Sequence, residues 1–290
     1  MRQLVLVHGR SPQRKDAAAL KAEWLDALHS GLAAAGLTLP IPESEVRFPY
    51  YGDTLDALTS GGTDPLSEII LPEADAQRAA FLRAVFLEVA RECGICDADV
   101  TAEAGPDVAE RGLQDRDWFR ALLRLLDRST LAGTASIALF IDDVYRYLTH
   151  IGIRDAIDST VQAAVTPGVE TVVVGHSLGS VVTYLLLRQE GTALGWHVPL
   201  HVTVGSPLGV GAVCERLVPI GHPTCANRWS NAADRRDVVA LHPLDATHFA
   251  VEPAIENKTD VDNTTPDRHG IRGYLTDPEV ACRIHRALTG

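Results

Sequence analysis

The sequence carries little positive charge and begins without a long apolar run, and each shortage excludes a class of protein. It has 26 Lys and Arg residues against 38 Asp and Glu residues, a formal net charge of -12 at pH 7. Because phosphate binding requires clustered Lys and Arg, and no long basic run occurs, we expect no nucleic-acid partner. The apolar run Leu4–Val7 is too short for a signal-peptide core or a membrane span. We therefore expect a cytoplasmic protein without stable membrane insertion.

Cysteine is also scarce. The chain has five cysteines, and an odd number without a secretory signal indicates free thiols rather than a disulfide framework. Cys93 and Cys96 form a single C-x-x-C, but a zinc site would need a second pair or nearby histidines. We therefore expect neither a metal nor another cofactor. Apolar residues make up 46% of the chain and charged residues 22%, which is typical of a globular protein with a sizeable core.

Strand-like and helix-like segments alternate along the chain. Leu4–Val7, closed by His8-Gly9, has the pattern of a strand buried on both faces of a parallel sheet, and the β-branched run at 170–175 is the strongest strand signal. Further strands are predicted at 46–51, 197–204 and 225–229, and helices at 16–32, 137–165 and 278–288. This alternation predicts an α/β fold, a mostly parallel sheet with helices on both faces.

Residues 54–136 contain no convincing strand and are predicted to form a helical insertion after the second strand, within a single domain spanning 1–290. Apolar residues follow helical spacing at 76–92 and 116–126. Two interpretations stay open for large side chains such as Phe86 and Trp118. They could pack as ordinary core, or they could line the acyl pocket of a lid over the site.

The strongest functional signal is Gly-His-Ser-Leu-Gly at 175–179. The motif follows a buried strand and opens a segment of helical periodicity, the setting of a nucleophile elbow. A tight turn there exposes the hydroxyl of Ser177 above the sheet, and the helix N-terminus directs N–H groups toward a developing oxyanion. The plainer interpretation is a serine that only caps the helix.

Serine needs a base within hydrogen-bond reach and a carboxylate that orients the base. In the fold that carries a nucleophile elbow the order along the chain is serine, acid, histidine, so the base is sought among the late histidines. We favour His269, which lies in a polar, turn-rich stretch just before the final helix. His285 falls in that helix, and His242 and His248 follow the candidate acid too closely.

Three aspartates compete for the acid. Asp237 is favoured because it lies in the loop after a predicted strand and directly before Val238-Val239. Asp234 lies in the same loop and stays open as the alternative, with a turn or capping role as its other interpretation. Asp245 is a weaker candidate because it lies farther from the strand end.

An oxyanion hole needs two N–H donors, one from the residue after the nucleophile and one from the loop after the first strand. These positions are Leu178 and Arg10, each acting through its backbone. His8 and His176 lie at strand ends, where we expect a packing or hydrogen-bonding role.

Four segments carry a family resemblance: Leu-Val-Leu-Val-His-Gly at 4–9, Val-Val-Val-Gly-His-Ser-Leu-Gly at 172–179, Asp-Val-Val at 237–239 and His-Gly at 269–270. Together the segments resemble bacterial α/β-hydrolases of the lipase and esterase group. The resemblance implies the α/β-hydrolase fold and a catalytic triad of Ser177, Asp237 and His269. The chain departs from the larger members because it begins directly at the strand before the oxyanion loop, and its insertion at 54–136 has no counterpart there.

These features predict a serine hydrolase that cleaves a carboxylic ester through an acyl-enzyme intermediate, with a small-molecule or lipid acyl ester as substrate. Thioesters, lactones and amides are open to the same attack. The alternative is a catalytically silent binding or regulatory protein on a hydrolase scaffold, because a fold does not by itself imply a function.

Overall fold

The computed structural model describes residues 2–10, 16–59, 64–70, 75–105 and 116–290. Within these residues the centre of the protein is a six-stranded, all-parallel sheet with strand order β2-β1-β3-β4-β5-β6. The strands are β1 (Gln3–Val7), β2 (Val46–Arg47), β3 (Thr171–His176), β4 (His201–Val204), β5 (Trp229–Ala232) and β6 (Glu256–Lys258). The predicted α/β class with a parallel sheet is confirmed.

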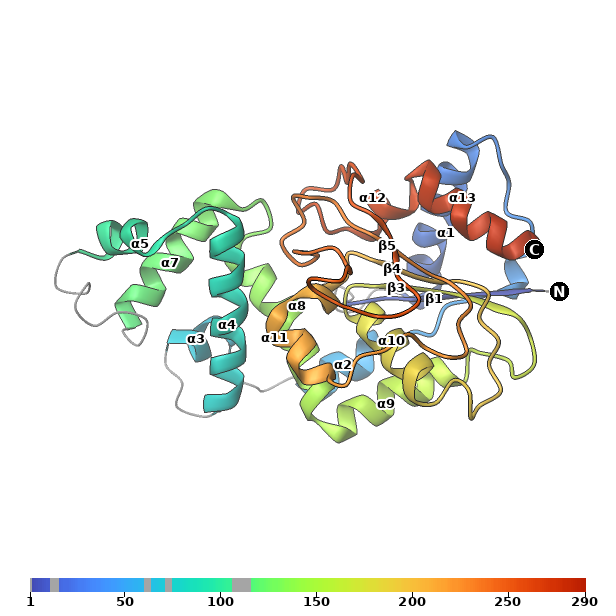
Figure 1. The fold of residues 1–290 in the computed structure, drawn as a ribbon, viewed down its shortest axis with the longest axis horizontal. Coiled ribbons are helices and arrows are strands. Elements are labelled where there is room, and N and C mark those ends of the chain that lie inside the picture. Colours follow the sequence, from blue (N-terminus) through green and yellow to red (C-terminus); the bar gives the residue numbers. More distant parts are fainter. Residues whose placement is uncertain (1, 11–15, 60–63, 71–74, 106–115) are drawn as a thin grey trace.

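Helices cover both faces of the sheet (Figure 1). Side chains alternate between the faces of a strand, so Leu4 and Leu6 of β1 pack in one apolar cluster and Val5 and Val7 in the other. The first cluster includes Trp24 and residues of the helices on that face, which are α1 (Ala17–Ala34), α12 (Ile271–Leu275) and α13 (Pro278–Thr289). The second includes residues of α8 (Thr134–Thr149), α9 (Ile151–Gln162) and α10 (Leu178–Gln189). Burial on both sides explains why Leu4–Val7 of β1 form a continuous apolar run.

The predicted helices at the two ends of the chain are confirmed as α1 and α13, and local capping explains where each begins. The Asp16 carboxylate accepts a hydrogen bond from Ala18 N–H at the start of α1, and the Asp277 carboxylate caps α13 in the same way. The predicted helix at 137–165 is instead two helices. Its break lies at His150, whose backbone is extended.

Three strands differ in their bounds from the prediction. The second strand ends at Arg47 rather than at residue 51, because Pro49 has no N–H to donate to a ladder. The strand predicted at 225–229 is β5, shifted toward the C-terminus. Its polar residues lie inside the sheet because their side chains bond across strands, as when Asn231 Oδ1 accepts from Thr203 Oγ at 2.9 Å. In the segment predicted at 197–204, the regular ladder of β4 covers only the second half.

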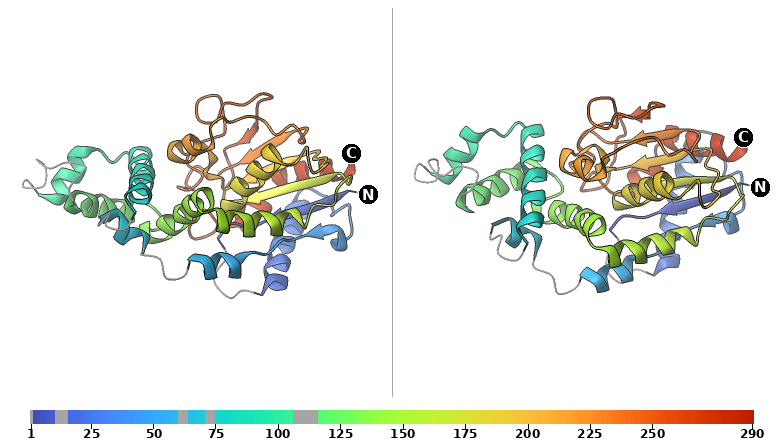
Figure 2. Two further views of the ribbon diagram at one scale, coloured as in Figure 1. Left: turned by 90° about the horizontal axis from the view of Figure 1, so that it is seen from below. Right: turned by 60° about the horizontal axis from the view of Figure 1, so that its bottom comes forward.

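A group of helices lies to one side of the sheet in all the views of Figures 1 and 2. We call it the helical lobe, and it consists of α3 (Pro65–Ile70), α4 (Ala76–Glu92), α5 (Asp97–Ala104) and α7 (Arg116–Ser129). The helices predicted at 76–92 and 116–126 are confirmed as α4 and α7. A further helix, α2 (Gly52–Thr59), packs on α9. None of the described residues between 54 and 136 lies in a strand.

The lobe has an apolar interior and a buried ionic contact with α8. Phe86 and Trp118 are fully or almost fully buried in the larger apolar cluster. The guanidinium of Arg78 on α4 donates to Asp142 on α8 at 2.5 Å and lies 3.7 Å from Glu68 on α3. Because Arg78 and Asp142 are both buried, this contact fixes the lobe to the helix that leads back to the sheet.

Phe86→Ala is expected to lower the free energy of unfolding by about 3–5 kcal/mol, because it removes buried apolar contacts and leaves a cavity. Urea denaturation measures the loss. Glu92→Ala, at an exposed position near the end of the same helix, serves as the control and should change stability by about 0.5 kcal/mol or less. A Phe86→Ala protein as stable as the control would contradict the core role of Phe86.

Candidate active site

Ser177 lies at the sharp turn between β3 and α10. Its φ of 54° and ψ of -125° are outside the usual regions for a residue with a side chain, a strain that is frequent at functional sites. A Cβ at Gly179 would collide with the carbonyl oxygen of Val7, so only glycine allows α10 to start so close to β1. The close packing of these two elements fixes the serine at the carboxyl edge of the sheet.

The structure brings the three predicted residues together in one hydrogen-bonded chain. His269 Nε2 lies 2.9 Å from Ser177 Oγ, and His269 Nδ1 lies 2.8 Å from Asp237 Oδ2. All three residues are buried, including Ser177, whose hydroxyl was expected to be exposed above the sheet. In this arrangement His269 can take the hydroxyl proton of Ser177 while Asp237 holds the Nδ1–H of the imidazole, which is the requirement for an activated serine nucleophile.

Four donors surround the carboxylate of Asp237. Oδ2 accepts from Tyr274 OH at 2.5 Å as well as from His269, and Oδ1 accepts from the N–H groups of Val239 at 2.9 Å and Ala240 at 3.3 Å. Burial, and then the nearby Asp237, raise the pKa of Tyr274 well above its ordinary value, so Tyr274 keeps its proton and donates. Each oxygen of this buried carboxylate is therefore satisfied.

Sequence reasoning missed Tyr274. The residue lies five positions after His269, in the stretch examined for the base, and a buried tyrosine hydroxyl requires a polar partner. The need for a polar partner was therefore the sequence signal that could have pointed to Tyr274. Nothing local indicated that α12 would place the hydroxyl against Asp237, 37 residues away along the chain.

The alternative acids have turn-stabilising contacts. Asp234 accepts hydrogen bonds from the backbone of Arg236 at 2.7 Å and of Asn263 at 2.8 Å. Asp245 accepts from the backbone N–H groups of Thr247 and His248. These contacts fit the turn or capping role that was the other interpretation of Asp234.

The alternative histidines also bond elsewhere. His242 Nε2 lies 2.7 Å from Glu88 of α4, and the ring of His248 stacks on that of His242 at 4.2 Å. His285 lies in α13. Among the described residues, His269 is the histidine whose ring nitrogen is hydrogen-bonded to Ser177.

His8 and His176 make backbone contacts, as predicted. Burial lowers the pKa of His176 to about 3, so the ring is neutral, and its Nε2–H donates to the carbonyl oxygen of His269 at 2.8 Å. Burial lowers the pKa of His8 to about 4. Its Nδ1–H donates to Gly9 O, and its Nε2 accepts from Tyr51 N–H. Both rings therefore support loops of the site.

The loop after β1 lies directly against the nucleophile. A Cβ at Gly9 would lie 2.5 Å from Ser177 Cβ and 3.1 Å from its Oγ, so only glycine permits this approach. Arg10 follows at once. Leu178 is the first residue of α10, where an N–H has no acceptor within the helix. Leu178 directly follows Ser177, and Arg10 directly follows Gly9, which packs against Ser177. The role of their backbone N–H groups as oxyanion donors stays a prediction.

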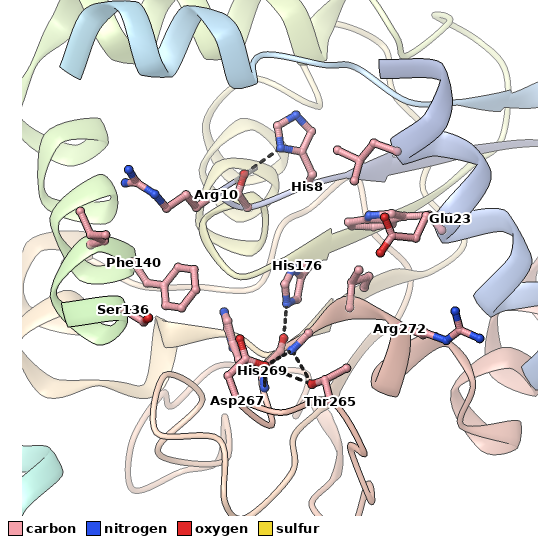
Figure 3. Close-up of a pocket in the computed structure, with 16 residues that line it drawn as sticks. His8, Arg10, Glu23, Ser136, Phe140, His176, Thr265, Asp267, His269 and Arg272 are labelled. Carbon is pink, nitrogen blue, oxygen red and sulfur yellow. Dashed lines mark hydrogen bonds between the residues drawn. The ribbon is translucent and has the colours of Figure 1, made fainter. Parts of the chain in front are cut away.

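A cavity of about 760 Å³ opens beside this chain (Figure 3). Its apolar side chains come from three helices, and they are Leu20 and Trp24 of α1, Leu139 and Phe140 of α8, and Ile271 of α12. His269 lines the cavity, and the Phe140 ring centroid lies 4.8 Å from that of His269. Phe86 and Trp118 are not among the residues that line it, and their burial in the larger apolar cluster favours the interpretation of these two residues as ordinary core. Their apolar surface forms the interior of the lobe instead.

Comparisons of the chain with protein-family models, with curated proteins and with solved structures found no match. Within the described residues, no cluster of His, Cys, Asp and Glu has an arrangement that could hold a metal ion. In the same residues, no helix has the length and apolar character needed to cross a membrane. The five cysteines are free thiols.

Asp237→Asn is expected to slow the reaction of Ser177 with a fluorophosphonate probe by about 10⁴-fold, since the amide cannot hold the imidazole in the required tautomer. Asp234→Asn, which changes the other buried aspartate of the loop, should slow labelling by less than about tenfold. Labelling rates and melting temperatures of both variants are measured together. The opposite ranking would make Asp234 the orienting carboxylate.

Proposed function

We propose that the protein is a serine hydrolase that cleaves a carboxylic ester, or a related acyl bond, through an acyl-enzyme intermediate. The observation that carries the proposal is the buried chain Ser177–His269–Asp237 beside a cavity. The α/β-hydrolase fold is part of the proposal. It is supported by the parallel sheet, by the strained serine after β3, and by the acid and base that follow β5 and β6 along the chain.

In the first half of the reaction, Ser177 Oγ attacks the acyl carbon while His269 Nε2 takes the hydroxyl proton. The negative charge that develops on the carbonyl oxygen is stabilised by the N–H groups of Arg10 and Leu178. His269 then gives its proton to the leaving alkoxide, and the acyl group stays on Ser177. In the second half, water replaces the alcohol, His269 takes a proton from it, and Ser177 recovers its proton as the carboxylic acid leaves.

The cavity favours a compact substrate. Its volume of about 760 Å³ lies within the range of about 300–1,000 Å³ that is usual for small-molecule sites. Apolar side chains of α1 and α8 supply much of its lining, as expected for binding the hydrocarbon part of an acyl ester. Polar groups beside them, such as Thr265 and Arg272, give the substrate an orientation.

Ser177→Ala is expected to lower kcat for a p-nitrophenyl ester by about 10⁶-fold, by comparison with other triads, and to abolish fluorophosphonate labelling while the protein stays folded. Ester hydrolysis and circular dichroism measure these effects. Activity within tenfold of wild type would reject the mechanism. A wild-type protein that neither hydrolyses esters nor reacts with the probe would favour the alternative, a silent binding protein on this fold.

The cavity wall gives a prediction about substrate size. Leu139→Trp would fill part of the cavity, so the preferred acyl chain should become shorter while p-nitrophenyl acetate is hydrolysed near the wild-type rate. A series of p-nitrophenyl esters measures the profile. The control is Leu131→Trp, because Leu131 is 62% exposed and does not line the cavity. If both variants keep the wild-type profile, the acyl group does not bind against α8.

A further inference from the structure

Arg10 is proposed to supply one oxyanion donor through its backbone, and its side chain fixes the position of that backbone. Arg10 Nη1 donates to both carboxylate oxygens of Asp143 on α8, at 2.8 Å and 2.9 Å. Figure 3 shows Arg10 reaching from the end of β1 toward the helix that carries Ser136 and Phe140. The Asp143 side chain is 1% exposed and that of Arg10 25%. The loop after β1 is thereby fixed to a helix 133 residues away along the chain.

Burial of this ion pair carries a desolvation cost. Burial raises the pKa of Asp143 to about 7, although the charge of Arg10 acts in the opposite direction. The carboxylate is therefore unfavourable in this environment, and buried ion pairs are often no more stabilising than apolar residues of the same volume. A contact of this kind adds a fixed geometry, because the buried carboxylate determines where the arginine can lie.

The same face of α8 also contacts the base. Phe140 precedes Asp143 by three residues, and residues with this spacing are neighbours on one side of a helix. The Phe140 ring packs against His269 at 4.8 Å between centroids. One helix face thus contacts both the imidazole that moves the proton and the loop beside Ser177.

We propose that Asp143 is a positioning residue that, through Arg10, holds the backbone of the oxyanion loop against Ser177. The inference rests on the proposed hydrolase function. Asp143 itself touches neither the nucleophile nor the base. Its effect on the reaction passes through Arg10, whose backbone N–H must keep its place as charge develops on the substrate oxygen.

The neighbouring residue provides a matched control. Asp142 is also a buried carboxylate of α8, but its partners are Arg78 of the lobe at 2.5 Å and Arg146 of α8 at 2.8 Å. Asn at either position removes one buried negative charge from the same helix. Only the change at position 143 removes the carboxylate that binds Arg10 of the loop beside Ser177.

Asp143→Asn is expected to lower kcat for p-nitrophenyl acetate by about 10- to 100-fold with little change in KM, since small displacements of catalytic groups have effects of this size. Asp142→Asn should lower the melting temperature while its kcat stays within about threefold of wild type. Both are measured well below their melting temperatures. A merely structural role for Asp143 would lower the melting temperature and leave kcat unchanged.

Variants of Arg10 test the same contact from its partly exposed side, and they decide the question if Asp143→Asn does not fold. Arg10→Gln should lower kcat as Asp143→Asn does, and Arg10→Lys, which keeps a cation for the carboxylate, should recover part of the loss. If Arg10→Gln raises KM and leaves kcat unchanged, the Arg10 side chain binds substrate, and the positioning role is rejected.

The failure of this inference is distinguishable from the failure of the proposed function. An active wild-type protein whose Asp143→Asn variant loses no more kcat than Asp142→Asn would overturn the role of Asp143 alone. A wild-type protein that is inert toward both the ester and the fluorophosphonate probe would overturn the hydrolase proposal and the role of Asp143 with it.

Discussion

The site depends on the close packing of two backbone segments at the carboxyl edge of the sheet. β1 and β3 pair in parallel, with Val7 opposite Gly175, so the loop after β1 and the turn after β3 leave the sheet side by side. Gly179 lies against the carbonyl oxygen of Val7, and Gly9 against Ser177. A side chain on either glycine would separate the segments. The placement of Ser177, and of the N–H groups proposed beside it as oxyanion donors, follows from this contact.

Around that contact, one buried carboxylate joins the remaining parts of the site. Asp237 receives hydrogen bonds from His269, from Tyr274 of α12 and from the backbone of its own loop. A buried carboxylate without donors is costly, so each of these segments must fold into place for the carboxylate to be accommodated. The hydrogen bonds that satisfy Asp237 also orient His269, and the stability of the loops and the geometry of the site are therefore coupled.

Helix α8 connects the site with the helical lobe. Its two adjacent buried carboxylates bind different arginines. Asp142 binds Arg78 of the lobe, and Asp143 binds Arg10 of the loop after β1. The large side chains of the lobe pack in its interior, whereas α8 itself contributes Leu139 and Phe140 to the cavity. Amphipathic helices in the sequence were a sound indication of packing, and they did not reveal which helix would line the cavity.

The sequence by itself determined the features that local chemistry fixes. Buried strands read as continuous apolar runs, Asp16 caps α1, and the glycines around Ser177 specify a strand-to-helix turn. Chain order restricted the candidate base to the late histidines. The polar, turn-rich setting of His269 favoured that residue, and Asp237 was favoured over Asp234 without excluding it. Only the tertiary structure showed that Asp237 is the aspartate bonded to His269, and where polar β5 lies in the sheet. It alone showed that Tyr274 bonds to Asp237 and that Asp143 bonds to Arg10. The physical reason is that these contacts join segments 32 to 133 residues apart, and a hydrogen bond between distant segments leaves no local pattern in the sequence.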